Sequence, residues 1–599
     1  SLAGDGIYCG FIKVAAKGDF AQLHAVIQGG NNFLSSQTFS WSILFDGVWP
    51  ETAFYTGRIW VPFGRNGVIA DATVDGRSGL FFDSISTIFS NGFALTALKD
   101  GAVWGAANMS ASRIDDFLPG PVGASLQDPR LGIYRVAQAD SAFGSSWQTW
   151  KYAVELGARF WDGNHNGIYD PIDLNNNGIW EPNEDMPEIL GEISYWCIYN
   201  DGVPKELRRY PIDPTGIEVR QTIYAFPNSS SQEVRNSVFI RYEIVNKGNV
   251  VQTLPGAYFS MWSDTDLGEY TDDLYGTDTL RNSMYFYNEG SDGSFGVNPP
   301  SVFHTILFGQ PVFVPGVSFT DVNNNGVYDP GVDIPLDTAR VPMGEPFTEK
   351  LLPGAMNFGS TSTQHYLSAH PTHGDPQTVN ELRSYQQGRQ KNGLIIDPCT
   401  WAYGQVYSDS CARIPGRFLY SGDPVTHKGW LTNTPTDQRG MVNAGPFNLN
   451  AGDSITFHTA IVIGRGTNEL NSITVTRAAI DTIFSRFGAK HHFYPTGVKE
   501  VAGVLPDEYR LYQNYPNPFN PETEVRFAIR ERSKVTVTVY DILGGKVADI
   551  LVSELERGEY RHTFNGKGLS SGVYFIRFEA RSVTTGVEFT KTIKAVLLQ

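Results

Sequence analysis

YQNYPNPFNPETEVRF, residues 512–527, is the stretch that decides how the C-terminal part of the chain folds. Pro516, Pro518 and Pro521 fix φ and lack a backbone N–H donor, which excludes a helix or a central strand and predicts an extended lead-in. After it, VTVTVY at residues 535–540 alternates at strand spacing. We therefore predict a small antiparallel β-sandwich of roughly 90 residues.

The same segment resembles a known family. The residues that carry the resemblance are YQNYPNPFNP at 512–521, VYDILGGKV at 539–547 and LSSGVYFIRF at 569–578. They are similar to the type A C-terminal sorting domain of the type IX secretion system of Bacteroidetes and their relatives. Over residues 505–599 the resemblance implies an immunoglobulin-like domain, the type IX machinery as a partner, and an extracellular or cell-surface location. The preceding residues more loosely resemble large surface proteins that carry this domain, and no activity comes with that likeness.

Composition narrows the class of protein. The 599 residues are 41% hydrophobic and 18% charged, which is typical of a globular protein and not of a disordered one. The formal net charge of −17 argues against nucleic acid or anionic lipid as partners and suits cations. The sequence holds no uninterrupted run of about 18 apolar residues, so no transmembrane segment is predicted.

Short aromatic and β-branched runs between Gly and Pro turns predict a mainly β, multi-domain chain with several immunoglobulin-like β-sandwiches and few helices. The predicted units are an N-terminal sandwich at 1–145, a β domain at 146–345 with loop insertions at 162–185 and 321–333, a β domain at 346–492 with a C-terminal helix, a linker at 493–504 and the sorting domain at 505–599. One further helix is expected where Trp147, Trp150, Val154 and Trp161 recur at helical spacing.

Three segments carry the spacing of a calcium-binding loop. In such a loop, oxygens at positions one, three, five and twelve and a backbone carbonyl at seven surround the ion, and glycine at six allows the sharp turn. The predicted ligands are Asp162, Asn164, Asn166, Ile168 (carbonyl) and Asp173 in the first loop, Asp173, Asn175, Asn177, Ile179 (carbonyl) and Glu184 in the second, and Asp321, Asn323, Asn325, Val327 (carbonyl) and Asp333 in the third.

The first two loops follow each other so closely that Asp173 would serve both. This head-to-tail sharing resembles the calcium repeats of thrombospondin type 3 and dockerin modules. The third loop departs from the pattern, because Val332 stands at position twelve and the acid, Asp333, follows one later. With few carboxylates per loop we expect calcium affinities of roughly 10⁻⁴–10⁻³ M, which suit an extracellular medium. The alternative is that Asn-Gly turns are common in loops and the spacing is accidental.

Three further groups of residues are of types found in disulfides or metal sites. Cys399 and Cys411, twelve residues apart, predict a disulfide in an oxidising compartment, whereas spacing does not support pairing Cys9 with Cys197. Asp264, Asp266, Asp272, Asp273 and Asp278 are either a further cation site or, as favoured, solvated carboxylates that cap turns. His365, His370 and His373 fit no rigid metal-binding face and are predicted to be surface loop histidines.

No catalytic motif stands in a context that supports catalysis. GLSSG at 568–572 matches G-x-S-x-G but lies in a turn between predicted strands, not at a strand-to-helix elbow. We therefore expect a non-catalytic secreted structural protein of the cell surface, stabilised by calcium and self-associating into a filament, sheath or layer. The alternatives are an adhesin that binds extracellular polysaccharide and a secreted hydrolase.

Overall fold

The computed structural model describes residues 48–109, 116–323, 325–489, 499–500, 509–514, 517–555, 558–583 and 585–598. Cys9, residues 1–47 of the predicted N-terminal unit and most of the predicted linker lie outside these residues. The described part is mainly β with four α-helices, and none of those helices is long and apolar enough to cross a membrane.

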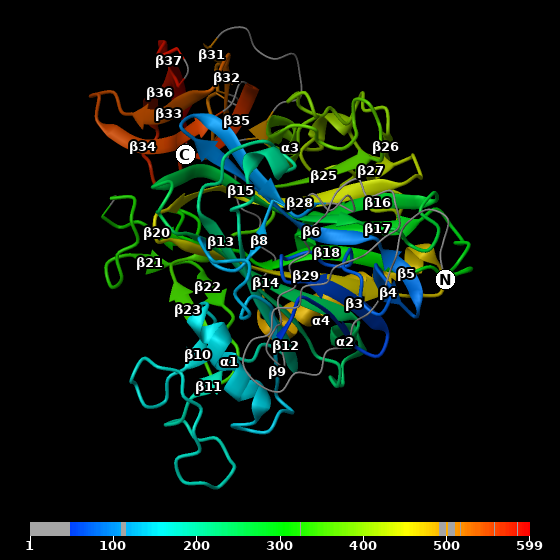
Figure 1. Cartoon of the computed structure of the whole chain (residues 1–599). Coiled ribbons are helices and arrows are strands. Elements are labelled where there is room, and N and C mark those ends of the chain that lie inside the picture. Colours follow the sequence, from blue (N-terminus) through cyan, green and yellow to red (C-terminus); the bar gives the residue numbers. More distant parts are fainter. Residues whose placement is uncertain are drawn as a thin grey trace.

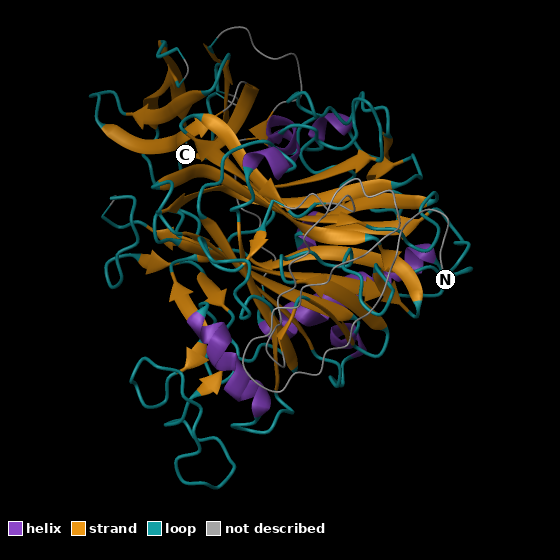
Figure 2. Ribbon diagram, viewed as in Figure 1, coloured by secondary structure: helices purple, strands orange, loops and turns teal. Residues whose placement is uncertain are grey.

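Two large antiparallel sheets form the body of the protein and lie face to face (Figure 1, Figure 2). Phe259 of one sheet stacks on Phe457 of the other, with ring centroids 4.3 Å apart and 8° between the planes, so the main core lies between the layers. The larger sheet has the order β1 (Val48–Trp49), β9 (Ile133–Ala137), β12 (Ile193–Asn200), β13 (Ile217–Ala225), β14 (Ser237–Asn246), β29 (Ser454–Gly464), β18 (Ser301–Phe308), β17 (Ser283–Asn288) and β16 (Asp273–Asp278), with β8 (Leu118–Pro119) paired to β12. The smaller has the order β25 (Ser362–Leu367), β28 (Gln438–Asn450), β15 (Thr253–Asp264), β6 (Ser90–Lys99) and β7 (Ala102–Ala107).

The central strand β14 is buried on both faces. Val238, Ile240 and Tyr242 point into the core between the sheets, and Phe239 packs on the opposite face under helix α4 (Glu469–Phe487). A strand covered on both sides reads as a nearly continuous apolar run, which is what VFIRYEIV at 238–245 shows. Asn468 is the N-cap of α4, and its side chain accepts a hydrogen bond from the Asn471 amide.

The predicted tryptophan helix is present but shorter than its pattern. α1 (Ser145–Glu155) buries Trp147 and Trp150 against the outer face of the larger sheet. Gly157 follows with φ of +109°, a conformation that favours glycine, and Trp161 lies in a strand instead.

The smaller elements complete the body of the protein. β2 (Glu51–Tyr55), β3 (Ile59–Gly64), β4 (Leu80–Phe82) and β5 (Ile85–Ile88) form one sheet, and β26 (Gly404–Tyr407) pairs with β27 (Gly429–Thr432). The remaining helices are α2 (Gln232–Arg235) and α3 (Val379–Gln386), and the 3-10 turns are η1 (Lys205–Leu207), η2 (Thr279–Arg281) and η3 (Cys411–Arg413).

The structure divides the chain differently from the predicted units. Strands from 1–145, 146–345 and 346–492 share both large sheets: β9 pairs with β12, and β14 and β18 both pair with β29. The predicted boundaries near 145 and 345 therefore do not separate sandwiches. Local patterning shows where strands begin and end, but it does not show which distant strand completes each hydrogen-bond ladder.

Two excursions leave the sheets and lie side by side. Residues 157–190, the first excursion, hold β10 (Phe160–Trp161) and β11 (Met186–Pro187). Residues 311–358, the second excursion, hold β19 (Pro311–Val312), β20 (Phe319–Thr320), β21 (Ile334–Pro335), β22 (Thr338–Val341), β23 (Lys350–Pro353) and β24 (Met356–Asn357). Trp161 contacts Phe347 at 5.6 Å between ring centroids, and Ile189 forms a β-bridge with Glu345. In Figure 1 the first excursion extends downward from the body.

The C-terminal segment forms an antiparallel sandwich with a core of its own, as its sequence predicts. Phe527 and Phe578, one from each sheet, meet with ring centroids 5.0 Å apart. One sheet has the order β30 (Lys499–Glu500), β35 (Gly558–Asn565), β32 (Glu522–Ile529) and β31 (Arg510–Leu511), and the other β34 (Lys546–Leu555), β33 (Ser533–Tyr540), β36 (Gly572–Ser582) and β37 (Glu588–Leu597).

A buried ion pair fastens both excursions to the larger sheet. Arg241 of β14 donates to both carboxylate oxygens of Glu188 at 2.9 and 2.7 Å, and Glu188 also accepts from the Gly344 amide at 3.0 Å. Burial alone would raise the pKa of Glu188, but Arg241, Arg159 and the Gly344 amide outweigh it and lower the pKa to about 2. A carboxylate with a depressed pKa stabilises the fold above its ordinary value of 4.5 and loses that contribution as pH falls toward 2.

We expect Glu188→Gln to lower the free energy of unfolding by about 3–5 kcal/mol at pH 7, because it leaves the Arg241 charge buried without its partner. The difference from wild type should shrink as pH falls from 4.5 toward 2, where Glu188 itself becomes protonated. Denaturant titrations at several pH values measure both effects. Glu349→Gln is the matched control, since its pair with Arg340 is partly exposed and should contribute less than about 1 kcal/mol. Equal losses in the two variants would contradict the anchoring role of Glu188.

Candidate metal-binding sites

The three predicted loops share one hydrogen-bond pattern at their start. The aspartate at position one accepts from the amides at positions five and six: Asp162 from Asn166 at 3.1 Å and from Gly167 at 2.8 Å. The equivalent pairs are Asp173 with Asn177 (3.1 Å) and Gly178 (2.6 Å), and Asp321 with Asn325 (3.2 Å) and Gly326 (2.7 Å). The position-six glycines have φ of +75°, +74° and +77°, so all three loops make the same left-handed turn there.

A second shared pattern identifies the closing carboxylate of each loop, which is the acid that accepts hydrogen bonds from the backbone amides at positions two and nine. In the second loop Glu184 accepts from the amides of Leu174 at 2.7 Å and Glu181 at 2.9 Å, which are positions two and nine. In the third loop Asp333 does the same with Val322 at 2.9 Å and Asp329 at 2.7 Å, so the one-residue offset is accommodated. The closing acids are buried, with 2% of Glu184 and 5% of Asp333 exposed.

In the first loop Asp185, rather than Asp173, occupies the closing place. Asp185 accepts from the amides of Gly163 at 3.0 Å and Asp170 at 2.9 Å, again positions two and nine, and it is 1% exposed. The structure therefore differs from the predicted sharing of Asp173, which here binds the amides of the second loop. The reason is that β11 brings the chain back beside the first loop, so the closing residue lies beyond the second loop in sequence.

The acids at position nine complete the arrangement and were missed by the sequence analysis. Asp170, Glu181 and Asp329 occupy this position in the three loops. Asn175 and Asn177 donate to Glu181 at 3.0 and 2.7 Å, and these hydrogen bonds lower the pKa of its carboxyl. Each loop thus gathers three carboxylates and two asparagines, a set of hard oxygen donors. The signal was present, because an acid stands nine residues into each loop.

The predicted position-seven residues contribute differently from the acids. Their amides donate to the position-five asparagine, from Ile168 to Asn166 at 2.7 Å for example. Their side chains are strongly exposed, at 65% for Ile168, 66% for Ile179 and 61% for Val327. Only the backbone of these residues can serve an ion bound within the loop, and the apolar side chains face solvent.

A separate acidic triad could hold a metal ion within the body of the protein. It consists of Asp264 at the end of β15, Asp266 just after it and Asp437 just before β28, with one oxygen of each within 4.8 Å of the others. Arg439 bonds Asp264 at 3.1 Å and lies 3.6 Å from Asp437. The other oxygen of Asp264, Oδ1, is buried and makes no hydrogen bond with any described residue.

The triad is short of positive charge. Burial raises the pKa of Asp264 to about 8 and that of Asp266 to about 6, even though Arg439 lowers both. The favoured interpretation of the acidic run as solvated carboxylates is wrong for Asp264, Asp273 and Asp278, which are all buried, although Asp278 does cap the turn η2. The run is also not a single site, since Asp278 instead pairs with Arg281 and Arg477, at 2.9 Å each. Asp437 was missed because the strand pairing of β15 with β28 brings it in from far downstream.

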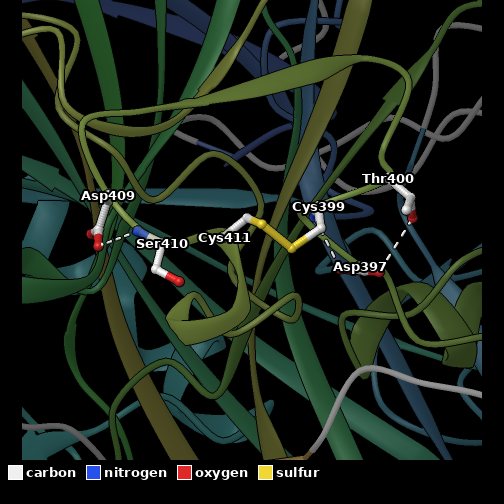
Figure 3. Close-up of a disulfide and its surroundings, with 6 residues drawn as sticks. All are labelled: Asp397, Cys399, Thr400, Asp409, Ser410 and Cys411. Carbon is white, nitrogen blue, oxygen red and sulfur yellow. Dashed lines mark hydrogen bonds between the residues drawn. A yellow bond between two sulfur atoms is a disulfide. The ribbon is translucent and has the colours of Figure 1, made fainter.

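Cys399 and Cys411 form a disulfide, with Cα atoms 5.0 Å apart (Figure 3). Asp397 stands beside it and accepts from the Cys399 amide at 2.9 Å and from the Thr400 hydroxyl at 3.3 Å. Cys197 is a buried free thiol, and burial raises its pKa to about 12, which leaves it inert as a nucleophile. Ser570 of the GLSSG match lies in the loop between β35 and β36, not at a strand-to-helix elbow.

The comparisons with known proteins identify the C-terminal segment. Residues 513–592 match the family model described as the secretion system C-terminal sorting domain. The chain is therefore a large protein exported by the type IX secretion system to the cell surface or the extracellular space. No curated protein matches it.

Two solved structures show distant likenesses. One is a polysaccharide lyase, 7% identical, at a TM-score of 0.22 over 93% of this chain and 47% of that one, so this chain spans less than half of the lyase. The other is the dimeric latent form of PorU from Porphyromonas gingivalis, 11% identical, at a TM-score of 0.14 over 68% of this chain and 31% of that one. At these TM-scores neither likeness assigns a fold or an activity to this chain.

We expect Asp185→Asn and Asp173→Asn each to remove a single bound ion, because each carboxylate serves one loop. Luminescence titration with Tb³⁺, a probe of oxygen-lined cation sites, counts the ions per chain. Asp213→Asn, which alters an exposed carboxylate in a loose pair with Lys205, should leave the count unchanged. Loss of two ions from Asp173→Asn, with none lost from Asp185→Asn, would instead support the prediction that Asp173 serves both loops.

Proposed function

We propose that this protein is a non-catalytic structural component of the cell surface whose loops are stabilised by calcium. The observation that carries the proposal is the repetition of one ligand arrangement in three loops: an aspartate at position one, asparagines at three and five, a left-handed glycine at six and a buried closing carboxylate. All three loops stand on the two adjacent excursions.

The donor chemistry supports calcium as the ion. The loops offer carboxylate, carboxamide and backbone carbonyl oxygens, the ligands that Ca²⁺ takes at flexible coordination numbers, whereas Mg²⁺ demands stricter octahedral geometry. Bound calcium would also offset the mutual repulsion of three carboxylates in each loop, in a chain with a net charge of −17. Such an ion holds a loop rigid, and this role fits an exported protein in a calcium-containing medium.

Self-association is part of the proposal. Each loop presents an exposed β-branched side chain, Ile168, Ile179 or Val327, beside the place where the ion would sit. Without calcium the acidic loops repel a second acidic copy, and with calcium that repulsion falls while the apolar side chains remain available. Calcium would thus control assembly as well as loop stability.

We expect removal of calcium to lower the melting temperature of the full chain by several degrees. At free calcium ten times the dissociation constant, each ion that binds only the folded state contributes about 1.4 kcal/mol. Differential scanning calorimetry in excess EGTA, and again after calcium is restored, measures the effect, with magnesium as the control that should restore little. A melting curve unchanged by EGTA would contradict the assignment of calcium to the loops.

We expect the combined variant Ile168→Ser, Ile179→Ser and Val327→Ser to bind calcium as wild type does but to fail to assemble. The reason is that position seven offers the ion only its carbonyl, so the side chain can change without loss of a ligand. Analytical ultracentrifugation and negative-stain electron microscopy with and without calcium report assembly. Val297→Ser, which alters an apolar side chain that is 74% exposed elsewhere, should assemble normally. Unchanged assembly of the triple variant would rule out the loops as the contact surface.

A further inference from the structure

Two histidines are enclosed in the body of the protein, contrary to their prediction as surface loop residues. His365 lies in β25 and His373 in the loop that follows, and they are 0% and 2% exposed. Their ring centroids are 5.6 Å apart. The enclosing rings are Tyr275 and Tyr420, each 5.2 Å from His365, and Trp401 and Tyr403, at 4.8 and 5.6 Å from His373.

Neither ring nitrogen of His373 makes a hydrogen bond within the described part of the chain, and the polar neighbour of the His365 ring is the Gln438 carboxamide. A neutral imidazole carries one donor and one acceptor, and each such atom buried without a partner costs about 1–3 kcal/mol. By contrast, both ring nitrogens of the buried His304 have partners, Nδ1 in Asn91 at 3.4 Å and Nε2 in the Thr265 hydroxyl at 3.1 Å. The bare nitrogens of His373 therefore indicate a bound group that satisfies them.

The geometry of the pair fits two ligands of one metal ion. Imidazoles bound through nitrogen at roughly 2.0–2.1 Å to a tetrahedral ion place their ring centroids about 5–5.5 Å apart. The observed 5.6 Å is close to that separation. Both rings are buried among aromatic groups, an environment that favours the neutral imidazole, which is the form that binds metals.

Gln438 supplies a third donor beside the pair. It stands opposite Leu367 in the register of β25 with β28, and Leu367 is two residues from His365, so both side chains project from the same face. Its amide nitrogen donates to the carbonyl of Asp273, which leaves the oxygen, Oε1, to face the His365 ring.

We propose that His365, His373 and the carboxamide oxygen of Gln438 bind a divalent transition-metal ion of the zinc type. Imidazole nitrogen selects such borderline ions, whereas the carboxylate and carbonyl oxygens of the loops select calcium, so the two kinds of site fill independently. The ion joins the loop that carries His373 to strands β25 and β28, and the aromatic rings around it shield it from solvent. The site is structural and does not depend on the calcium loops.

The test is to dialyse the full chain against excess calcium, so that the oxygen-lined sites are filled, and then to titrate it with Co²⁺. Wild type should retain a single cobalt ion per chain, with the visible absorption of a nitrogen-ligated ion, and Zn²⁺ should displace it. His365→Gln and His373→Gln should each abolish retention, and Gln438→Leu should weaken it about tenfold.

The matched controls separate loss of the metal from loss of the fold. His458→Gln removes an equally buried histidine outside the pair and should retain cobalt, as should Asp264→Asn in the acidic triad. Circular dichroism establishes whether each variant is folded. The number of cobalt ions bound per wild-type chain tests the proposal even if a variant does not fold. Failure of wild type to retain cobalt in excess calcium, or undiminished retention by a folded His373→Gln, would overturn the proposal and leave buried water as the partner of the bare nitrogens.

Discussion

The ion pair of Glu188 with Arg241 is the contact on which the arrangement of the candidate sites depends. β14 is covered by apolar groups on both faces, so a charge on it must find its partner inside the protein. Glu188 provides that partner from the first excursion and at the same time receives the Gly344 amide from the second. A single carboxylate thereby fixes two insertions that are distant in sequence, and it holds the three loops at one side of a rigid sandwich.

The polar groups of the protein fall into two chemical classes that share one scaffold. The loops and the triad of Asp264, Asp266 and Asp437 offer oxygen ligands and concentrate negative charge. In the triad, Arg439 offsets that charge only in part. His365 and His373 are buried imidazoles among aromatic rings. Oxygen ligands favour calcium and imidazole nitrogen favours zinc-type ions, so the two proposed kinds of site would take different ions. The disulfide of Cys399 with Cys411 adds a covalent cross-link to this exported chain.

Sequence reasoning succeeded where the information is local and failed where folding brings distant residues together. The proline-rich lead-in and the alternating strands after it were enough to predict the C-terminal sandwich and its sorting-domain family. The Asp-Asn-Gly spacing marked three segments that make the same left-handed turn. The predicted division into units at 145 and 345 differs from the strand pairing, because β9, β14 and β18 pair with strands on the other side of those boundaries. For the same reason Asp185 and Asp437 could not be assigned from spacing, and the burial of His365 depends on rings contributed by other segments.

Glu184 and Asp185 are consecutive residues, yet they close two different loops. One peptide bond therefore links the walls of two neighbouring candidate cation sites. Whichever site fills first restrains the backbone that its neighbour must also order, so the second ion meets a smaller entropic cost. The first excursion should for this reason respond to calcium as a cooperative unit, with a binding curve steeper than that of two independent sites, while the third loop titrates by itself.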